Sequence, residues 1–110
     1  MGLCDNASMR ALNHPSRKGL TLSGVLYALS DPVRLSIVKS IAAHGEQSCG
    51  TFGLSVAKST ASHHFRVLRE TGVIQMRAEG TQYINSLRRE DLDNRFPGLL
   101  DAVLQASNPV

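Results

Sequence analysis

The segment of residues 58–72 has the hydrophobic pattern of an amphipathic α-helix. Its apolar face has the i, i+3, i+4 and i+7 spacing and consists of Ala61, His64, Phe65 and Leu68. The opposite face is polar and carries Ser59, Ser62, His63, Arg66 and Arg69. Gly72 follows at a position where a left-handed glycine commonly ends a helix. The pattern predicts a helix that ends near Gly72 and presents hydroxyl, imidazole and guanidinium groups outward.

Two more helices are predicted before this segment. Apolar residues line one side of residues 21–29, namely Leu22, Val25, Leu26 and Leu29. Asp31-Pro32 then separates two helices, because proline disfavours helix in the preceding residue and suits the first helical position, where Asp31 can cap. The second helix is expected from Pro32 to about Ala43. Residues 45–48 are expected to be a loop, and residues 49–54 a short, weakly helical piece because two glycines interrupt it.

The pattern changes to that of β-structure after Gly72. Residues 73–77 and 82–87 contain β-branched residues in rough alternation, and the turn between them holds Gly80, which predicts a hairpin. A charged stretch covers residues 88–95. Pro97 is expected to open a last helix over residues 97–106, with an apolar ridge of Leu99, Leu100, Val103 and Leu104. The predicted fold is mainly α with a small β-hairpin: a winged helix-turn-helix with about five helices and a two-stranded wing.

Length and charge narrow the class of protein further. With 110 residues there is room for one domain, expected over residues 19–110, preceded by a polar, mobile arm over residues 1–18. A net charge of +3 fits a nucleic-acid partner, although many proteins without one are equally basic. No apolar run is long enough to cross a membrane, and the N-terminus lacks the apolar region of a secretory signal. The expected location is therefore cytoplasmic, with Cys4 and Cys49 reduced.

Three segments in order resemble the ArsR/SmtB family of bacterial repressors. Residues 29–35 match its L-x-D-P-x-R opening, residues 59–74 resemble its recognition helix and the segment after it, and residues 79–83 match its wing turn. The resemblance covers roughly residues 20–88. It implies a sequence-specific homodimeric repressor that binds a palindromic operator in double-stranded DNA and is released by an effector, which the chain does not identify. No cofactor is expected.

The resemblance also implies which residues act. DNA contacts are implied for Lys58, Ser59, Thr60, Ser62, His63 and Arg66 on the recognition helix and for Arg77 on the wing. Lys58 stands where the family commonly has glutamine, so a phosphate or guanine contact is expected in place of an amide that reads a base. His64 is interpreted as a partly buried structural histidine. The first and last helices are implied to form the dimer interface, through Leu22, Leu26, Leu99, Leu100, Val103 and Leu104.

The number of possible metal ligands indicates whether the protein could sense a metal ion. Cys49-Gly50-Thr51 lacks the second thiol of the family's Cys-x-Cys metal site, and residues 89–110 contain no histidine for its C-terminal site, so no metal is expected. Cys4 and Cys49 leave a redox switch open as an alternative. The simpler interpretation is that Cys49 is a small buried residue near the core.

Two other classes of function compete with DNA binding. A winged-helix protein-interaction module without specific DNA binding has the same topology. It predicts weak salt dependence and indifference to changes at Lys58, Ser59, Ser62 and Arg66, whereas a DNA-binding protein loses affinity steeply as salt rises. An enzyme, such as a thiol hydrolase built on Cys49, is not expected, because no acidic orienting partner or oxyanion loop is recognisable.

Overall fold

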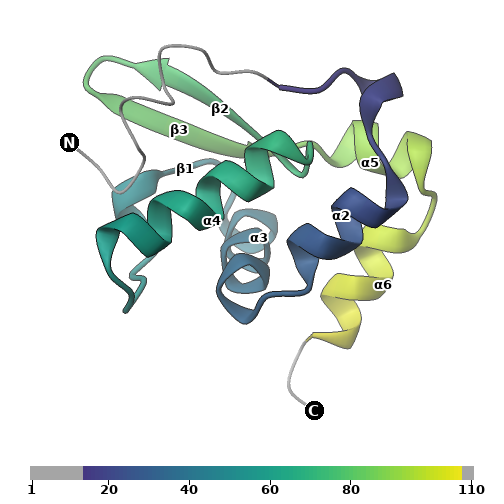
Figure 1. Ribbon diagram of the computed structural model, residues 1–110, viewed down its shortest axis with the longest axis horizontal. Helices are drawn as coiled ribbons and strands as arrows, with labels where there is room; N and C mark the ends of the chain where they lie inside the picture. The colour runs from purple at the N-terminus through teal and green to yellow at the C-terminus, as the bar shows by residue number, and fades with distance from the viewer. Residues whose placement is uncertain (1–13, 108–110) are drawn as a thin grey trace.

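The structure, a computed structural model, describes residues 14–107 of the chain. Within that range it has five α-helices and one three-stranded antiparallel sheet (Figure 1). The helices are α2 (Leu22–Leu29), α3 (Pro32–His44), α4 (Lys58–Glu70), α5 (Arg89–Arg95) and α6 (Leu99–Ala106). The strands are β1 (Gln47–Ser48), β2 (Ile74–Glu79) and β3 (Gln82–Leu87), and the 3₁₀ turns are η1 (Arg17–Gly19) and η2 (Cys49–Thr51). The predicted winged helix-turn-helix is confirmed, although several elements differ in detail.

Capping residues begin the first two helices where the sequence indicates. The Thr21 side chain caps α2 by accepting a hydrogen bond from a backbone N–H in the first turn at 3.1 Å. Asp31 caps α3, its Oδ2 accepting from the backbone N–H groups of Val33 at 2.8 Å and Arg34 at 3.0 Å. Pro32 occupies the start of α3, where its fixed φ suits the helix and no hydrogen bond is lost. Both helices therefore form at the predicted positions.

Glycines end α4 and form the turn of the wing. Gly72 has a φ of 85°, in the left-handed region that favours glycine, and the chain enters β2 directly after it. Strands β2 and β3 pair antiparallel with Glu79 opposite Gln82, which leaves a two-residue turn. Gly80 in this turn has a φ of 63°. The hairpin agrees with its prediction, and β3 has the predicted bounds.

The expectation of a loop over residues 45–48 is wrong. Gln47 and Ser48 form β1, which pairs with β3 opposite Asn85 and Ile84 and adds a third strand to the sheet. The side chain of Asn85 also donates from Nδ2 to the carbonyl oxygen of Gln47 at 3.2 Å. Because these partners lie far apart in the sequence, a two-residue polar strand leaves no local pattern to find.

The C-terminal region also differs from the prediction. The charged stretch contains α5, which buries Leu92, while residues 49–51 form only a 3₁₀ turn. The fifth α-helix is therefore α5 and not the glycine-containing segment. Helix α6 begins at Leu99 and not at Pro97, because Gly98 before it adopts a left-handed conformation with φ of 79°.

Residues 14–18 pack against the domain, so the expected arm boundary at residue 18 is wrong. His14 Nε2 accepts a hydrogen bond from the backbone N–H of Met76 at 3.0 Å. The carbonyl oxygen of Pro15 accepts one from Arg88 Nη1 at 2.7 Å. Residues 1–13, which make up the rest of the expected arm, lie outside the described residues.

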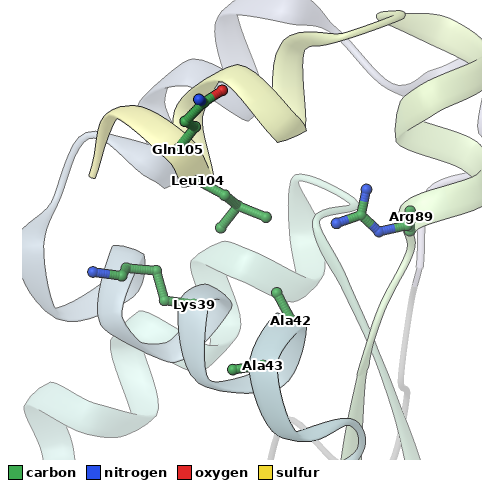
Figure 2. Close-up of a pocket in the computed structure, with 6 residues that line it drawn as sticks. All are labelled: Lys39, Ala42, Ala43, Arg89, Leu104 and Gln105. Carbon is green, nitrogen blue, oxygen red and sulfur yellow. The ribbon is translucent and has the colours of Figure 1, made fainter. Parts of the chain in front are cut away.

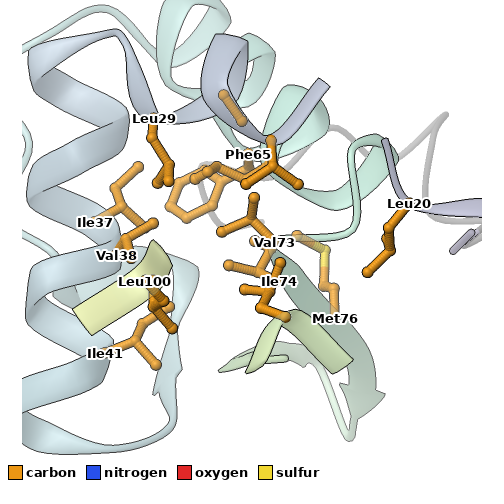
Figure 3. Close-up of a cluster of buried hydrophobic side chains, with 14 of the residues drawn as sticks. Leu20, Leu29, Ile37, Val38, Ile41, Phe65, Val73, Ile74, Met76 and Leu100 are labelled. Atoms are coloured by element: carbon orange, nitrogen blue, oxygen red, sulfur yellow. The ribbon is translucent and has the colours of Figure 1, made fainter. Parts of the chain in front are cut away.

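The core joins α4 to α3, to the sheet and to α6 (Figure 3). Its largest fully buried apolar side chains include Phe65, Leu20, Ile37, Leu68, Ile74, Met76 and Leu100. Phe65 also meets the ring of Phe52 at a centroid distance of 5.4 Å. Burying the apolar face of α4 in this way leaves its polar face outside, except for Arg69, which was expected on that face but is only 4% exposed.

Candidate nucleic-acid interface

The polar face of α4 is exposed along its N-terminal half. Ala61, Phe65 and Leu68 are buried on the opposite face and set the rotation of the helix about its axis. Four predicted contact residues are exposed, namely Lys58, Ser59, Thr60 and His63, and two are half-buried, namely Ser62 and Arg66. The structure thus brings these six residues together on one face, as predicted.

The start of α4 is suited to an anion. Ala57 precedes the helix and offers no capping side chain, so the N-cap residue gives no side-chain oxygen to the amide groups of the first turn. Backbone N–H groups at a helix start carry partial positive charge and bind phosphate readily. Lys58 adds a full positive charge at the same place. Phosphate binding at this end would place the outer face of α4 beside base edges.

The predicted wing residue, Arg77, is exposed on β2 and engaged with two carboxylates. Its Nη1 and Nη2 lie 2.7 Å and 2.9 Å from the two carboxylate oxygens of Glu46, and its Nη2 lies 3.2 Å from Glu79 Oε2. The hydrogen bonds that Arg77 donates to Glu46 and Glu79 raise the pKa of Arg77, and the Arg77 guanidinium lowers the pKa of Glu46. A DNA phosphate must therefore replace Glu46 to pair with Arg77. The sequence does not reveal this competition.

His64 lies on the buried face of α4, in agreement with its interpretation as a structural residue. It is 8% exposed, and its Nδ1 lies 3.1 Å from Nη1 of the buried Arg34. Burial lowers the pKa of His64 below the ordinary imidazole value. Arg34 belongs to the L-x-D-P-x-R segment, but the sequence alone assigned it no role at this site.

Cys49 is buried, as the simpler interpretation requires, but it is not a reduced thiol. Cys49 is 2% exposed, and Nδ2 of Asn85 on β3 donates a hydrogen bond to its Sγ at 3.2 Å. Cys49 is disulfide-bonded in the structure, contrary to the expectation of reduced cysteines. Cys4 lies outside the described residues. No group of three or more His, Cys, Asp or Glu residues that could hold a metal occurs within residues 14–107.

An apolar surface lies on α2. The exposed large apolar side chains of the described range are Leu22, Leu26 and Tyr27, at 50%, 45% and 55% exposure. Of the residues predicted for the dimer interface on α6, Leu99, Val103 and Leu104 are partly buried. Leu100 is only 2% exposed and packs inside its own protomer, so its assignment to the dimer surface is wrong. Tyr27 was missed, although it directly follows Leu26.

A cavity of about 420 Å³ lies between α3, α6 and the start of α5 (Figure 2). Ala42, Ala43 and Leu104 provide apolar lining. The charged lining residues already have partners: Lys39 Nζ donates to the carbonyl oxygen of Ser107 at 3.1 Å, and Arg89 pairs with Asp101 at 2.8 Å. The cavity therefore has an apolar lining, and its two charged lining residues already pair with other groups of the protein. Of the described helices, none is long and apolar enough to cross a membrane.

Comparisons with known proteins show the family to which the chain belongs. A model of the helix-turn-helix domain matches residues 29–77. The HTH-type transcriptional regulator YceK of Bacillus subtilis is 37% identical over 83 residues, which cover 72% of this chain and 82% of that protein. The HTH-type transcriptional regulator MJ1325 of Methanocaldococcus jannaschii is 36% identical over 59 residues, covering 52% of this chain and 66% of that protein.

The same fold occurs in the crystal structure of an ArsR family transcriptional regulator, RHA00566. It superposes with a TM-score of 0.58 at 21% identity, over 80% of this chain and 93% of that one. This similarity confirms the winged fold that the three sequence segments indicated. The similar proteins are transcriptional regulators, a class without catalytic activity, so the enzyme alternative is set aside.

The carboxylate of Glu46 should weaken DNA binding by occupying Arg77. Glu46→Gln removes the charge that pairs with the guanidinium and is expected to raise the affinity for duplex DNA a few-fold at low salt. Fluorescence anisotropy with a labelled duplex measures the change. Glu90→Gln is the matched control, because it removes an equal charge from a carboxylate that pairs with Arg17 instead. Equal affinities for the Glu46→Gln and Glu90→Gln variants would show that Arg77 does not contact DNA.

Proposed function

Because the chain belongs to the family of helix-turn-helix transcriptional regulators, we propose that it is a sequence-specific DNA-binding repressor that acts as a homodimer and is released by an effector. The observation that carries this proposal is the exposed polar face of α4, which combines Lys58 with hydroxyl, imidazole and guanidinium groups. The proposed place of action is the cytoplasm, where the operator is accessible.

The arrangement of α4 and the wing supports binding to one face of a duplex. In Figure 1 the N-terminal end of α4 and the tip of the β2–β3 hairpin lie on the same side of the molecule. In winged helix-turn-helix proteins the second helix of the motif enters the major groove, and the wing can reach the adjacent backbone. Helix α4 is therefore the proposed reading helix, and Arg77 on β2 the proposed wing contact.

The apolar surface of α2 supports a symmetric dimer. Leu22, Leu26 and Tyr27 are exposed together, although exposing large apolar side chains to water costs free energy. A two-fold dimer through α2 and the exposed parts of Leu99, Val103 and Leu104 on α6 would bury them. It would also present two copies of α4 to an inverted repeat with half-sites about one helical turn apart.

Substitutions on α4 should separate phosphate contacts from base contacts. Lys58→Ala and Arg66→Ala are expected to weaken binding to every sequence and to flatten its dependence on salt. Ser62→Ala and His63→Ala are expected to reduce the preference for the operator by roughly 1–3 kcal/mol per lost base contact. Anisotropy titrations at several salt concentrations, with the DNA upstream of the coding sequence and a scrambled duplex, measure both effects.

The same titrations distinguish a DNA-binding repressor from a protein-interaction module. Unchanged operator affinity in all four variants would rule out α4 as the reading helix. If the unmodified chain also shows weak salt dependence and no preference over scrambled DNA, the protein is better described as a winged-helix interaction module.

A charge on α2 should separate the protomers. Leu26→Asp places a carboxylate in the proposed apolar interface, and a monomer is expected because that charge must lose its hydration on association. Since Leu26 is half-exposed in the protomer, the fold should survive the change. Sedimentation equilibrium compares this variant with Ser55→Asp, which adds the same charge at an exposed position outside α2 and α6. A Leu26→Asp variant that remains dimeric would place the interface elsewhere.

A thiol-based effector is the second candidate, supported by the disulfide at Cys49 and its contact with Asn85 on β3. A change of oxidation state there would act on the strand that carries the wing. Reduction of the disulfide at Cys49 by dithiothreitol, which adds two electrons and two protons to give thiols, is expected to change operator affinity. The Cys4→Ser and Cys49→Ser variants should lack this response in the same anisotropy assay. A response that persists in both variants would exclude these cysteines as the sensor.

A further inference from the structure

Arg34 is a buried cation whose side chain joins three helices. It lies in the first turn of α3 and is only 5% exposed. Its Nε donates to the carbonyl oxygen of Ala28 at 2.8 Å, and its Nη2 donates to that of Tyr27 at 3.1 Å. Both carbonyls belong to the last turn of α2, and that of Tyr27 also accepts hydrogen bonds from the backbone N–H of Ser30 at 3.2 Å and from its Oγ at 2.7 Å. The remaining nitrogen, Nη1, lies 3.1 Å from Nδ1 of His64 in α4.

The contact between Arg34 and His64 defines the protonation state of the imidazole. A guanidinium donates hydrogen bonds and accepts none, so His64 Nδ1 must be the acceptor. The ring is therefore neutral, with its proton on Nε2. Asp31 Oδ2 lies 3.7 Å from the same Nδ1, beyond hydrogen-bond distance, and already accepts two backbone N–H groups.

The same guanidinium also meets the apolar surface of α2. Its carbon lies 4.9 Å from the centre of the Tyr27 ring, in the geometry of a cation–π contact. Tyr27 is 55% exposed and belongs to the surface proposed to form the dimer. A continuous set of contacts thus runs from Tyr27 through Arg34 to His64, which lies beside His63 on α4.

We propose that Arg34 is a positioning residue for DNA recognition, which holds α4 in a defined orientation relative to α2 through its hydrogen bond to His64. This inference rests on the proposed function. In a dimer formed through α2, the orientation of α4 relative to α2 sets the separation of the two reading helices. Since the half-sites of a duplex have a fixed spacing, a small rotation of α4 costs contacts in both half-sites.

Protonation of His64 should break this contact. A protonated ring has no acceptor at Nδ1 and would face the guanidinium as a second cation. The charged groups around the ring are Asp31, which caps α3, Arg34 from α3 and His63 from α4; Asp31 favours the charge, while Arg34 and His63 oppose it. Because burial places the pKa of His64 below the ordinary value of 6.5, the contact is intact at neutral pH. It is lost as the pH falls through that lowered pKa.

The first part of the test compares two buried arginines in the full chain. Arg34→Lys keeps the charge but cannot reach three acceptors in three directions. It is expected to lower the affinity for the upstream duplex by roughly tenfold, the scale of one lost hydrogen bond to a charged group. Arg88→Lys is the matched control: the Arg88 side chain is also buried, but its side-chain partners are Asp91 and the carbonyl oxygen of Pro15, neither of which belongs to α4. Its operator affinity should stay near that of the unmodified chain.

The second part uses pH, which a merely structural role for Arg34 would not predict. Anisotropy titrations from neutral pH downward through the lowered pKa of His64, at constant ionic strength, should show the unmodified chain losing affinity as the pH falls. His64→Asn supplies an amide oxygen near the position of Nδ1 and does not titrate, so its affinity should be retained at neutral pH and lose this acid dependence. His63→Asn removes the neighbouring imidazole and should keep the acid dependence. Circular dichroism at each pH confirms that every variant is folded.

Three results would overturn the inference. They are operator affinity unchanged in Arg34→Lys, an equal loss in Arg88→Lys, and an acid dependence that persists in His64→Asn. If Arg34→Lys does not fold, the comparison of His64→Asn with His63→Asn decides alone. If the unmodified chain does not prefer the upstream duplex over scrambled DNA, the proposed function fails. If it does and the Arg34 and His64 variants match it, only the inference fails.

Discussion

The burial of one face of α4 is the constraint on which the rest of the structure depends. Phe65 and Leu68 are almost fully excluded from solvent and pack in the core with α3 and β2. At about 25 cal/mol per Å² of buried apolar surface, rotating this helix by one residue would cost several kcal/mol, so its polar face has only one orientation. The position of Lys58, Ser59 and His63 on the surface is a consequence of that packing.

Much of the fold was predictable because local chemistry determines it. The helical period marks α2, α3 and α4, Asp31 and Pro32 mark the start of α3, and Gly80 marks the wing turn. The errors have a common cause, since each depends on residues distant in the sequence. Strand β1 exists only because β3 lies beside it. The charged segment that forms α5 has little apolar pattern, and the burial of Leu100 depends on how α6 packs against the core.

At the candidate site, too, the features set by neighbouring residues were predictable, whereas those set by residues distant in the sequence were not. The polar face of α4 follows from the helical period, so its residues are predictable from the sequence, with the exception of Arg69, which the structure buries at 4% exposure. The state of Arg77 was not, because its partner Glu46 is 31 residues away. The role of Arg34 was also hidden: a buried arginine is stable only with its donors satisfied, and those acceptors lie on α2 and α4. The exposed polar face of α4 thus lies above a buried polar contact between Arg34 of α3 and His64 of α4.

The most direct test of the account is to map where DNA contacts the protein. Two-dimensional ¹⁵N–¹H NMR spectra, recorded as the duplex from upstream of the coding sequence is added, report on each backbone amide. If α4 and the wing contact DNA, the largest shifts are expected in residues 58–66 of α4 and residues 77–82 of the wing. Shifts confined to α5 and α6, or no shifts at all, would contradict the assignment of α4 as a DNA-reading helix.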